Sequence, residues 1–455
     1  MILPPRLILT SALIAGVATM AEAQNSQPRL LRWTEDYSLL RVEPHEFPRT
    51  LKFIPLRDEG TTYLSLGGEL RERIDAYDHP LFGLTSAGAY ASLQSRFLIH
   101  GDLHDGPDRR LFVQLGAFDE QGREPGERTF DEGALDVQLV FADFGTPEWM
   151  QLRVGRQEIV LPGARNAAVR EATNIRRAFD GVKLGLARET YAIDLFVASA
   201  VELEDDYFSD HPDENEQFWG AYATTIDEFL TDVTVDFFYL GRRREDALYA
   251  EGVGDEVRHM VGTRIALVRG AYDLDAQAAI QFGRFGDGDI LAWHLAADAG
   301  YSLDEDPLSP RLSLRLEVAS GDRRNGDGDL GTYHPLYPNG TYVTDAAILL
   351  PGNSIDLQPA VTVTPAKGLK LSAGIDLFWR LDKDDAVYQP ANVPLVGPGG
   401  AGRFVSAQPF LRAVWRPSPY VEVTGAVSYA TAGDVIDAAG GHALTYGLAQ
   451  IAFRL

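Results

Sequence analysis

Hydrophobic and polar residues alternate along most of this chain with a period of two. Residues 271–283 show the pattern: apolar residues stand at positions 272, 274, 276, 278, 280 and 282, and most of the residues between them are Asp or Gln. The same alternation recurs over residues 310–320 and 369–380. Because successive side chains of a β-strand point to opposite faces, each segment predicts a strand with one apolar and one polar face.

About eighteen segments of this kind follow one another. They lie near residues 63–77, 90–103, 110–118, 134–143, 150–158, 177–187, 190–201, 217–225, 231–241, 257–268, 271–285, 289–303, 310–321, 355–364, 369–381, 403–415, 420–430 and 443–455. Most span 9–15 residues, whereas a strand of a soluble globular protein averages about five or six. Strands of this length suit a tilted crossing of an outer membrane, which takes about 9–11 residues.

The connections between these segments alternate between short and long. Short ones lie at 105–108, 188–189, 269–270, 365–368 and 416–419, and long ones lie near 119–133, 159–176, 202–216, 242–256, 322–354 and 382–402. Short periplasmic turns and long extracellular loops are typical of outer-membrane barrels. The sequence therefore predicts an all-β fold, a transmembrane antiparallel β-barrel of about 18 strands, with a soluble β-sandwich or propeller as the alternative.

The N-terminus has the features of a secretory signal peptide. Arg6 precedes the apolar stretch Leu7–Ala18, and Ala21-Glu22-Ala23 forms an A-x-A cleavage site. The apolar stretch is short for a bilayer-spanning helix, although an N-terminal anchor is the alternative. We therefore divide the chain into a signal peptide (1–23), an N-terminal periplasmic extension (24–62) and an outer-membrane β-barrel (63–455).

Composition narrows the function classes. The chain has 455 residues, a formal net charge of −25 and no Cys. Without cysteine there is neither a disulfide scaffold nor a thiolate site for catalysis, zinc or an iron–sulfur cluster. The strongly acidic balance argues against a nucleic-acid-binding surface.

Eight short motifs, taken in order, resemble those of the alginate-export family of outer-membrane proteins. They are residues 66–73 (LGGELRER), 155–158 (GRQE), 174–183 (NIRRAFDGVK), 281–285 (QFGRF), 319–322 (ASGD), 336–338 (LYP), 378–380 (FWR) and 385–388 (DAVY). The resemblance covers nearly the whole chain after the leader. It implies an 18-stranded barrel and passive export of an anionic polysaccharide, such as the polyuronate alginate, through an arginine-rich lumen.

One departure from the family concerns its long periplasmic plug loop, which the best-known exporter carries between strands eight and nine. Here that connection is only about residues 226–230. The substrate therefore stays open between an alginate-like polyuronate and the small anionic or sugar-acid solutes of a general diffusion porin.

The polar face of the barrel supplies candidate pore residues. Arginine binds carboxylates bidentately and stays charged, so inward-facing basic residues suit the passage of a polyuronate. The candidates are Arg71, Arg73, Arg96, Arg153, Arg156, Arg165, Arg176, Arg177, Lys183, Arg264, Arg315 and Arg380. Inward acidic residues are about equally numerous, so Arg–carboxylate pairs that brace the barrel wall are an equally open interpretation.

Five arginines crowd one long connection and its flanks. They are Arg156, Arg165, Arg170, Arg176 and Arg177, with Glu158 and Glu171 as the nearby acids. We expect this connection to form an anion filter if it folds into the lumen.

Residues 325–329 (NGDGD) resemble the start of a calcium-binding loop. Leu330 and Leu336 stand where an EF-hand needs Gly and Glu. Asp322, Asp327 and Asp329 are therefore candidate ligands for a structural Ca²⁺, with a solvated turn as the alternative. We expect no other cofactor.

These patterns together predict a passive channel in contact with outer-membrane lipid. No outward Ser–His pair or G-x-S-x-G motif stands out in the sequence. An outer-membrane enzyme is the alternative from another class.

Overall fold

The structure is a computed structural model that describes residues 28–42, 46–57, 60–124, 126, 128–146, 149–225, 232–303, 306–400 and 402–455. The signal peptide expected at 1–23 and the connection expected at 226–230 lie outside the described residues.

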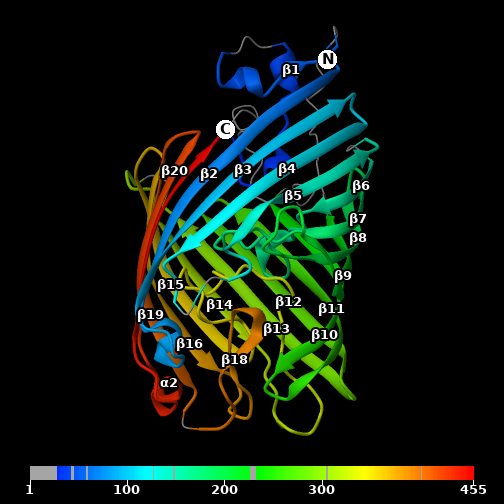
Figure 1. The fold of residues 1–455 in the computed structure, drawn as a ribbon. Helices are drawn as coiled ribbons and strands as arrows, with labels where there is room; N and C mark the ends of the chain where they lie inside the picture. Colours follow the sequence, from blue (N-terminus) through cyan, green and yellow to red (C-terminus); the bar gives the residue numbers. More distant parts are fainter. Residues whose placement is uncertain are drawn as a thin grey trace.

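Eighteen long strands form one closed antiparallel barrel (Figure 1). They are β2 (Thr62–Asp78), β3 (Tyr90–Asp105), β4 (Arg109–Gln121), β5 (Gly133–Phe144), β6 (Met150–Gln157), β7 (Phe179–Ala187), β8 (Tyr191–Glu202), β9 (His211–Thr225), β10 (Val233–Tyr249), β11 (Gly252–Arg269), β12 (Tyr272–Phe285), β13 (Gly288–Ser302), β14 (Arg311–Ala319), β15 (Ser354–Ala366), β16 (Leu369–Arg380), β19 (Phe404–Ser418), β20 (Val421–Ala430) and β21 (Leu444–Arg454). Strand β2 pairs with both β3 and β21, which closes the sheet. The predicted fold class is confirmed, and each predicted segment corresponds to one of these strands.

Smaller elements lie at the ends of the barrel. β1 (Ile54–Pro55) pairs with the start of β2, and β17 (Val387–Gln389) pairs with β18 (Val393–Val396). The short helices are η1 (Arg32–Thr34), η2 (Ser38–Arg41), η3 (Arg49–Leu51), η4 (Pro80–Gly83), η5 (Pro162–Ala164), η7 (Pro390–Asn392) and α2 (Asp434–Ala438). No helix among the described residues has the length and apolar character to cross a membrane, a finding that does not bear on strands.

The two faces of the sheet divide as the alternation predicts. On β12, the outward Ile280 and Phe282 are 53 % and 43 % exposed, whereas the inward Gln277 and Gln281 are buried. This arrangement inverts that of a soluble protein, in which large apolar side chains are buried and charged ones are exposed. An apolar outer surface around a polar interior is what an outer membrane requires.

Two details of the expected pattern are wrong. The long loop expected near 242–256 is instead the paired extracellular end of the β10–β11 hairpin, which turns at 250–251. Strands above the membrane lose the apolar alternation because water meets both faces. Asp143, which the alternation places outward, is buried, because Gln138 and Leu139 both face inward where the β4–β5 register shifts.

Two long connections fold into the lumen. We call residues 158–178, between β6 and β7, the inner loop, and residues 320–353, between β14 and β15, the second loop. They meet where Ala167 pairs with Tyr337 in a parallel bridge. Around that bridge, buried side chains of both loops pack against Phe179 and Phe218 of the wall.

The segment before β2 lies at the end of the barrel that carries the short turns, at the top of Figure 1. Trp33 inserts into a buried cluster with Phe112 of β4, Leu139 and Phe141 of β5, and Ala178 of the inner loop. Because short turns face the periplasm in barrels of this type, this segment occupies the periplasmic end.

The apolar outer face yields a direct test of membrane contact. Leu295 lies mid-strand on β13 and Leu308 in the periplasmic turn, and the two are exposed to nearly the same extent, 52 % and 47 %. We expect Leu295→Arg to lower the free energy of unfolding by about 2–4 kcal/mol, because the charge enters hydrocarbon. Leu308→Arg, which stays in water, should leave it nearly unchanged. Reversible urea unfolding in lipid vesicles measures both, and equal effects would contradict this assignment of the outer face.

Candidate functional site

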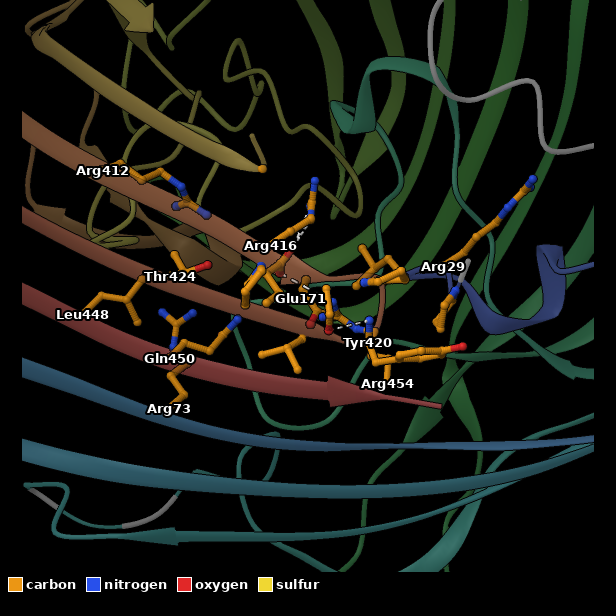
Figure 2. Close-up of a pocket in the computed structure, with 18 of the residues that line it drawn as sticks. Arg29, Arg73, Glu171, Arg412, Arg416, Tyr420, Thr424, Leu448, Gln450 and Arg454 are labelled. Carbon is orange, nitrogen blue, oxygen red and sulfur yellow. Dashed lines mark hydrogen bonds and ion pairs between the residues drawn. The ribbon is translucent and has the colours of Figure 1, made fainter. Parts of the chain in front are cut away.

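Two cavities occupy the lumen, one toward each end of the barrel. A cavity of about 830 Å³ borders the short turns through Lys367, Arg416 and Tyr420 (Figure 2). A second cavity of about 620 Å³ borders the long loops through Pro80 and Pro390.

Three residues line both cavities and therefore mark the boundary between them. They are Arg73 of β2, Ala172 of the inner loop and Asp345 of the second loop. We interpret this boundary as the constriction of a passage from one end of the barrel to the other.

The barrel wall holds the inner loop across the lumen. Arg71 donates to the Glu171 carbonyl at 2.6 Å, and Arg96 donates to the Thr173 and Asn174 carbonyls, both at 2.7 Å. The Asn174 amide donates in turn to the backbone carbonyls of Ser95 and Asp119 at 3.0 Å. Arg71 and Arg96 therefore fix the backbone of the loop rather than offering their charges to the passage.

Most of the other candidate arginines pair with carboxylates along the wall. The shortest nitrogen–oxygen distances are Arg73–Asp75 2.6 Å, Arg153–Asp143 2.7 Å, Arg156–Asp180 2.9 Å, Arg165–Asp275 2.6 Å, Lys183–Asp194 2.9 Å, Arg264–Asp275 2.5 Å and Arg315–Asp356 2.9 Å. Arg380 donates to the carbonyl of Gly402 at the opposite end of the barrel from the termini. Of the twelve candidates, Arg73, Arg176 and Arg177 line the cavities, and the other nine lie in the wall or hold its loops.

The charged side chains that line the two cavities are predominantly basic. The first cavity has Arg29, Arg73, Lys367, Arg412, Arg416 and Arg454 against Glu171, Asp345 and Glu422. The second has Arg73, Arg123, Arg128, Arg170, Arg176, Arg177, Arg242 and Arg244 against Asp75, Glu124, Asp213, Glu216 and Asp345. This excess contrasts with the net charge of −25 of the whole chain. Arg242 and Arg244 were missed as candidates, although the inward parity of Leu240 extends to both.

Two arginines of the second cavity contact aromatic rings. Arg177 lies 5.2 Å from the ring centre of Tyr337, and Arg170 lies 5.0 Å from that of Phe130. Within the described residues neither forms a salt bridge. Burial lowers the pKa of Arg177 to about 9, helped by repulsion from Arg170, whose own pKa burial lowers to about 10. Both stay charged at neutral pH, so they have charge to offer a solute.

The expected calcium ligands are not gathered into a site. Asp322 accepts the backbone N–H of Arg324, and Asp327 faces the Arg324 side chain at 3.7 Å. The N–H groups of Gly326 and Gly328 both donate to the Glu251 carboxylate at 2.6 Å. Among the described residues, no three His, Asp or Glu side chains are placed to hold a metal ion. The turn that contains Gly326 and Gly328 therefore binds the Glu251 carboxylate through its backbone N–H groups.

The family model described as alginate export matches residues 62–450. None of the curated protein sequences matches the chain.

Three solved porin structures share the fold. OccK2 (OpdF) of Pseudomonas aeruginosa, in complex with glucuronate, has a TM-score of 0.57 and 11 % identity, covering 89 % of this chain and 99 % of its own. A BenF-like porin from Pseudomonas fluorescens Pf-5 has a TM-score of 0.59 and 11 % identity, covering 86 % and 99 %. OccK11 (OpdR) of P. aeruginosa has a TM-score of 0.55 and 12 % identity, covering 86 % and 96 %. At these identities the likeness shows the barrel fold.

The inner loop should loosen in acid through Glu171. Burial alone would raise the pKa of Glu171, but Arg176 and Arg96 beside it lower it to about 2. Its ion pairs therefore stabilise the loop above the ordinary glutamate pKa of about 4.3 and are lost as the pH falls toward 2. We expect single-channel current noise to rise between pH 4.5 and 2.5. Glu171→Gln should be noisy at both values, and equal noise in the wild type at both would contradict this role.

Proposed function

This chain belongs to the alginate-export family, and we propose that it passively conducts an anionic polysaccharide of the polyuronate class across the outer membrane. The family and the fold are those of outer-membrane channels rather than of enzymes. The observation that carries the substrate proposal is the position of Arg170 and Arg177, which line the second cavity and form no salt bridge among the described residues.

The arrangement of the arginines suits a moving polyanion. Arginines that are paired along the wall keep the barrel rigid. Arg170 and Arg177 contact rings instead, and apart from one bond of Arg177 to the carbonyl of Pro338, their N–H groups can bind a passing carboxylate. The carboxylate of each sugar can then bind one guanidinium after another as the chain moves, since binding at several weak sites lets a solute both enter and leave.

The constriction favours a second candidate, the passage of single sugar acids. The inner loop crosses the lumen and separates the two cavities at Ala172. OccK2, one of the porins with the same fold, was solved with glucuronate. Under this proposal the channel is a diffusion porin for small carboxylated solutes.

Planar-bilayer recordings with uronate oligomers of increasing length distinguish the two candidates. For a polyuronate exporter, block should strengthen with length and saturate once an oligomer spans both cavities. For a sugar-acid porin, monomers should carry current and longer oligomers should stay outside. Neutral oligosaccharides of matched length are the control, and equal block by charged and neutral oligomers would reject both candidates.

The two ring-stacked arginines should set the anion preference. We expect the double variant Arg170→Gln/Arg177→Gln to shift the reversal potential toward cations. It should also weaken oligouronate block by about tenfold or more, since one hydrogen bond to a charged group contributes about 1.5–3 kcal/mol. Arg188→Gln, in a periplasmic turn, is the matched control. Unchanged selectivity in the double variant would remove these two residues from the permeation path.

A further inference from the structure

The N-terminal segment forms hydrogen bonds with the inner loop near both ends of that loop. We call residues 28–35 the strap. The Trp33 indole N–H donates to the Glu158 carboxylate at 2.7 Å, and Arg176 donates to the carbonyl of Leu30 at 3.1 Å. Glu158 is the first residue of the inner loop and Arg176 lies two residues before its end. The strap therefore holds the loop near both of its attachments to the wall.

The strap is also bound to the barrel wall. Trp33 is buried among Phe112, Leu139 and Phe141, and the Arg153 guanidinium lies 4.6 Å from its ring centre. Arg32 is also buried and donates to the carbonyl of Leu455, next to the seam between β2 and β21. Because the strap is fixed to the wall in this way, it can hold the inner loop in place.

A continuous line of contacts leads from the strap to the constriction. Leu30 bonds Arg176, Arg176 bonds the Glu171 carboxylate at 2.5 Å, and Ala172 follows at the boundary of the two cavities. Arg176 also reaches Glu69 of the wall at 3.3 Å. Pro28, Arg29 and Leu30 themselves line the periplasmic cavity. The strap thus forms part of the passage and braces its narrowest point.

Glu158 is the contact best suited to release. It is buried, one carboxylate oxygen accepts the Trp33 indole N–H, and the other has no hydrogen-bond partner among the described residues. A buried carboxyl group with a single partner is held weakly, because the unsatisfied oxygen costs free energy that solvation of the loop would recover.

We propose that the strap is a periplasmic latch that keeps the inner loop across the lumen and that its withdrawal widens the channel. Opening is then controlled from the periplasmic side, where the strap lies, by whatever draws residues 28–35 out of the Trp33 cluster. The proposal concerns regulation of the same passage and rests on its being a conducting channel.

A graded set of variants tests the latch by single-channel conductance. Trp33→Ala removes both the ring and the indole donor, and should raise conductance at least about twofold, since conductance follows the width of the narrowest point. Trp33→Phe keeps a ring and loses the donor, so it should lie between Trp33→Ala and the wild type. Leu39→Ala, an exposed residue of the same segment, is the matched control and should match the wild type.

Thiol labelling gives an independent readout. The chain has no cysteine, so Ala172→Cys carries a single thiol at the boundary of the cavities. We expect a charged methanethiosulfonate to label it several-fold faster when Trp33→Ala is also present. On a gel, a folded variant is recognised because the unheated sample migrates faster than the same sample after heating.

The outcomes separate this proposal from the function proposed above. If Trp33→Ala folds and leaves both conductance and the labelling rate of Ala172→Cys unchanged, the latch is rejected, whatever the channel transports. If those two quantities rise but oligouronates neither block nor permeate the wild type, the latch stands and the polyuronate proposal fails.

Discussion

Closure of the sheet is the constraint on which the rest of this structure depends. Within hydrocarbon no water is available, so each backbone N–H and C=O must find a partner in the protein. The pairing of β2 with β21 supplies the last row of partners and leaves no free edge in the bilayer. Closure in turn creates an interior, and the inner faces of eighteen strands fill it with the polar half of the alternation. The lumen thus follows from the requirement that every backbone N–H and C=O in the bilayer has a hydrogen-bond partner.

The charges of that interior serve two purposes. Paired groups such as Arg264 and Asp275 lie across neighbouring strands, where each neutralises the other and little charge reaches the passage. An arginine that contacts a ring and forms no salt bridge among the described residues keeps its charge available, as Arg177 does over Tyr337. Counting inward residues of each sign hides this division, because the count weights a neutralised pair and an available guanidinium equally.

The sequence predicted the barrel well because its signal is local. The alternation within each strand determines which side chains face outward. Ile280 and Gln281 therefore point in opposite directions whatever the rest of the fold is. The loops carry no such signal. That Arg71 and Arg96 would grip the inner loop depends on where residues about 75 to 100 positions later come to lie, which no periodicity encodes. Asp143 shows the limit on the strands, since a single bulge reverses every side chain beyond it.

The unequal strand lengths give the barrel an uneven outline. β10 and β11 have 17 and 18 residues, whereas β6 and β7 have 8 and 9. Since about ten residues cross the bilayer, the β10–β11 hairpin extends beyond the membrane, whereas β6 and β7, a few strands away in the same sheet, do not. The rim of the extracellular mouth is therefore uneven, and a solute at the mouth meets a higher wall at β10 and β11 than at β6 and β7.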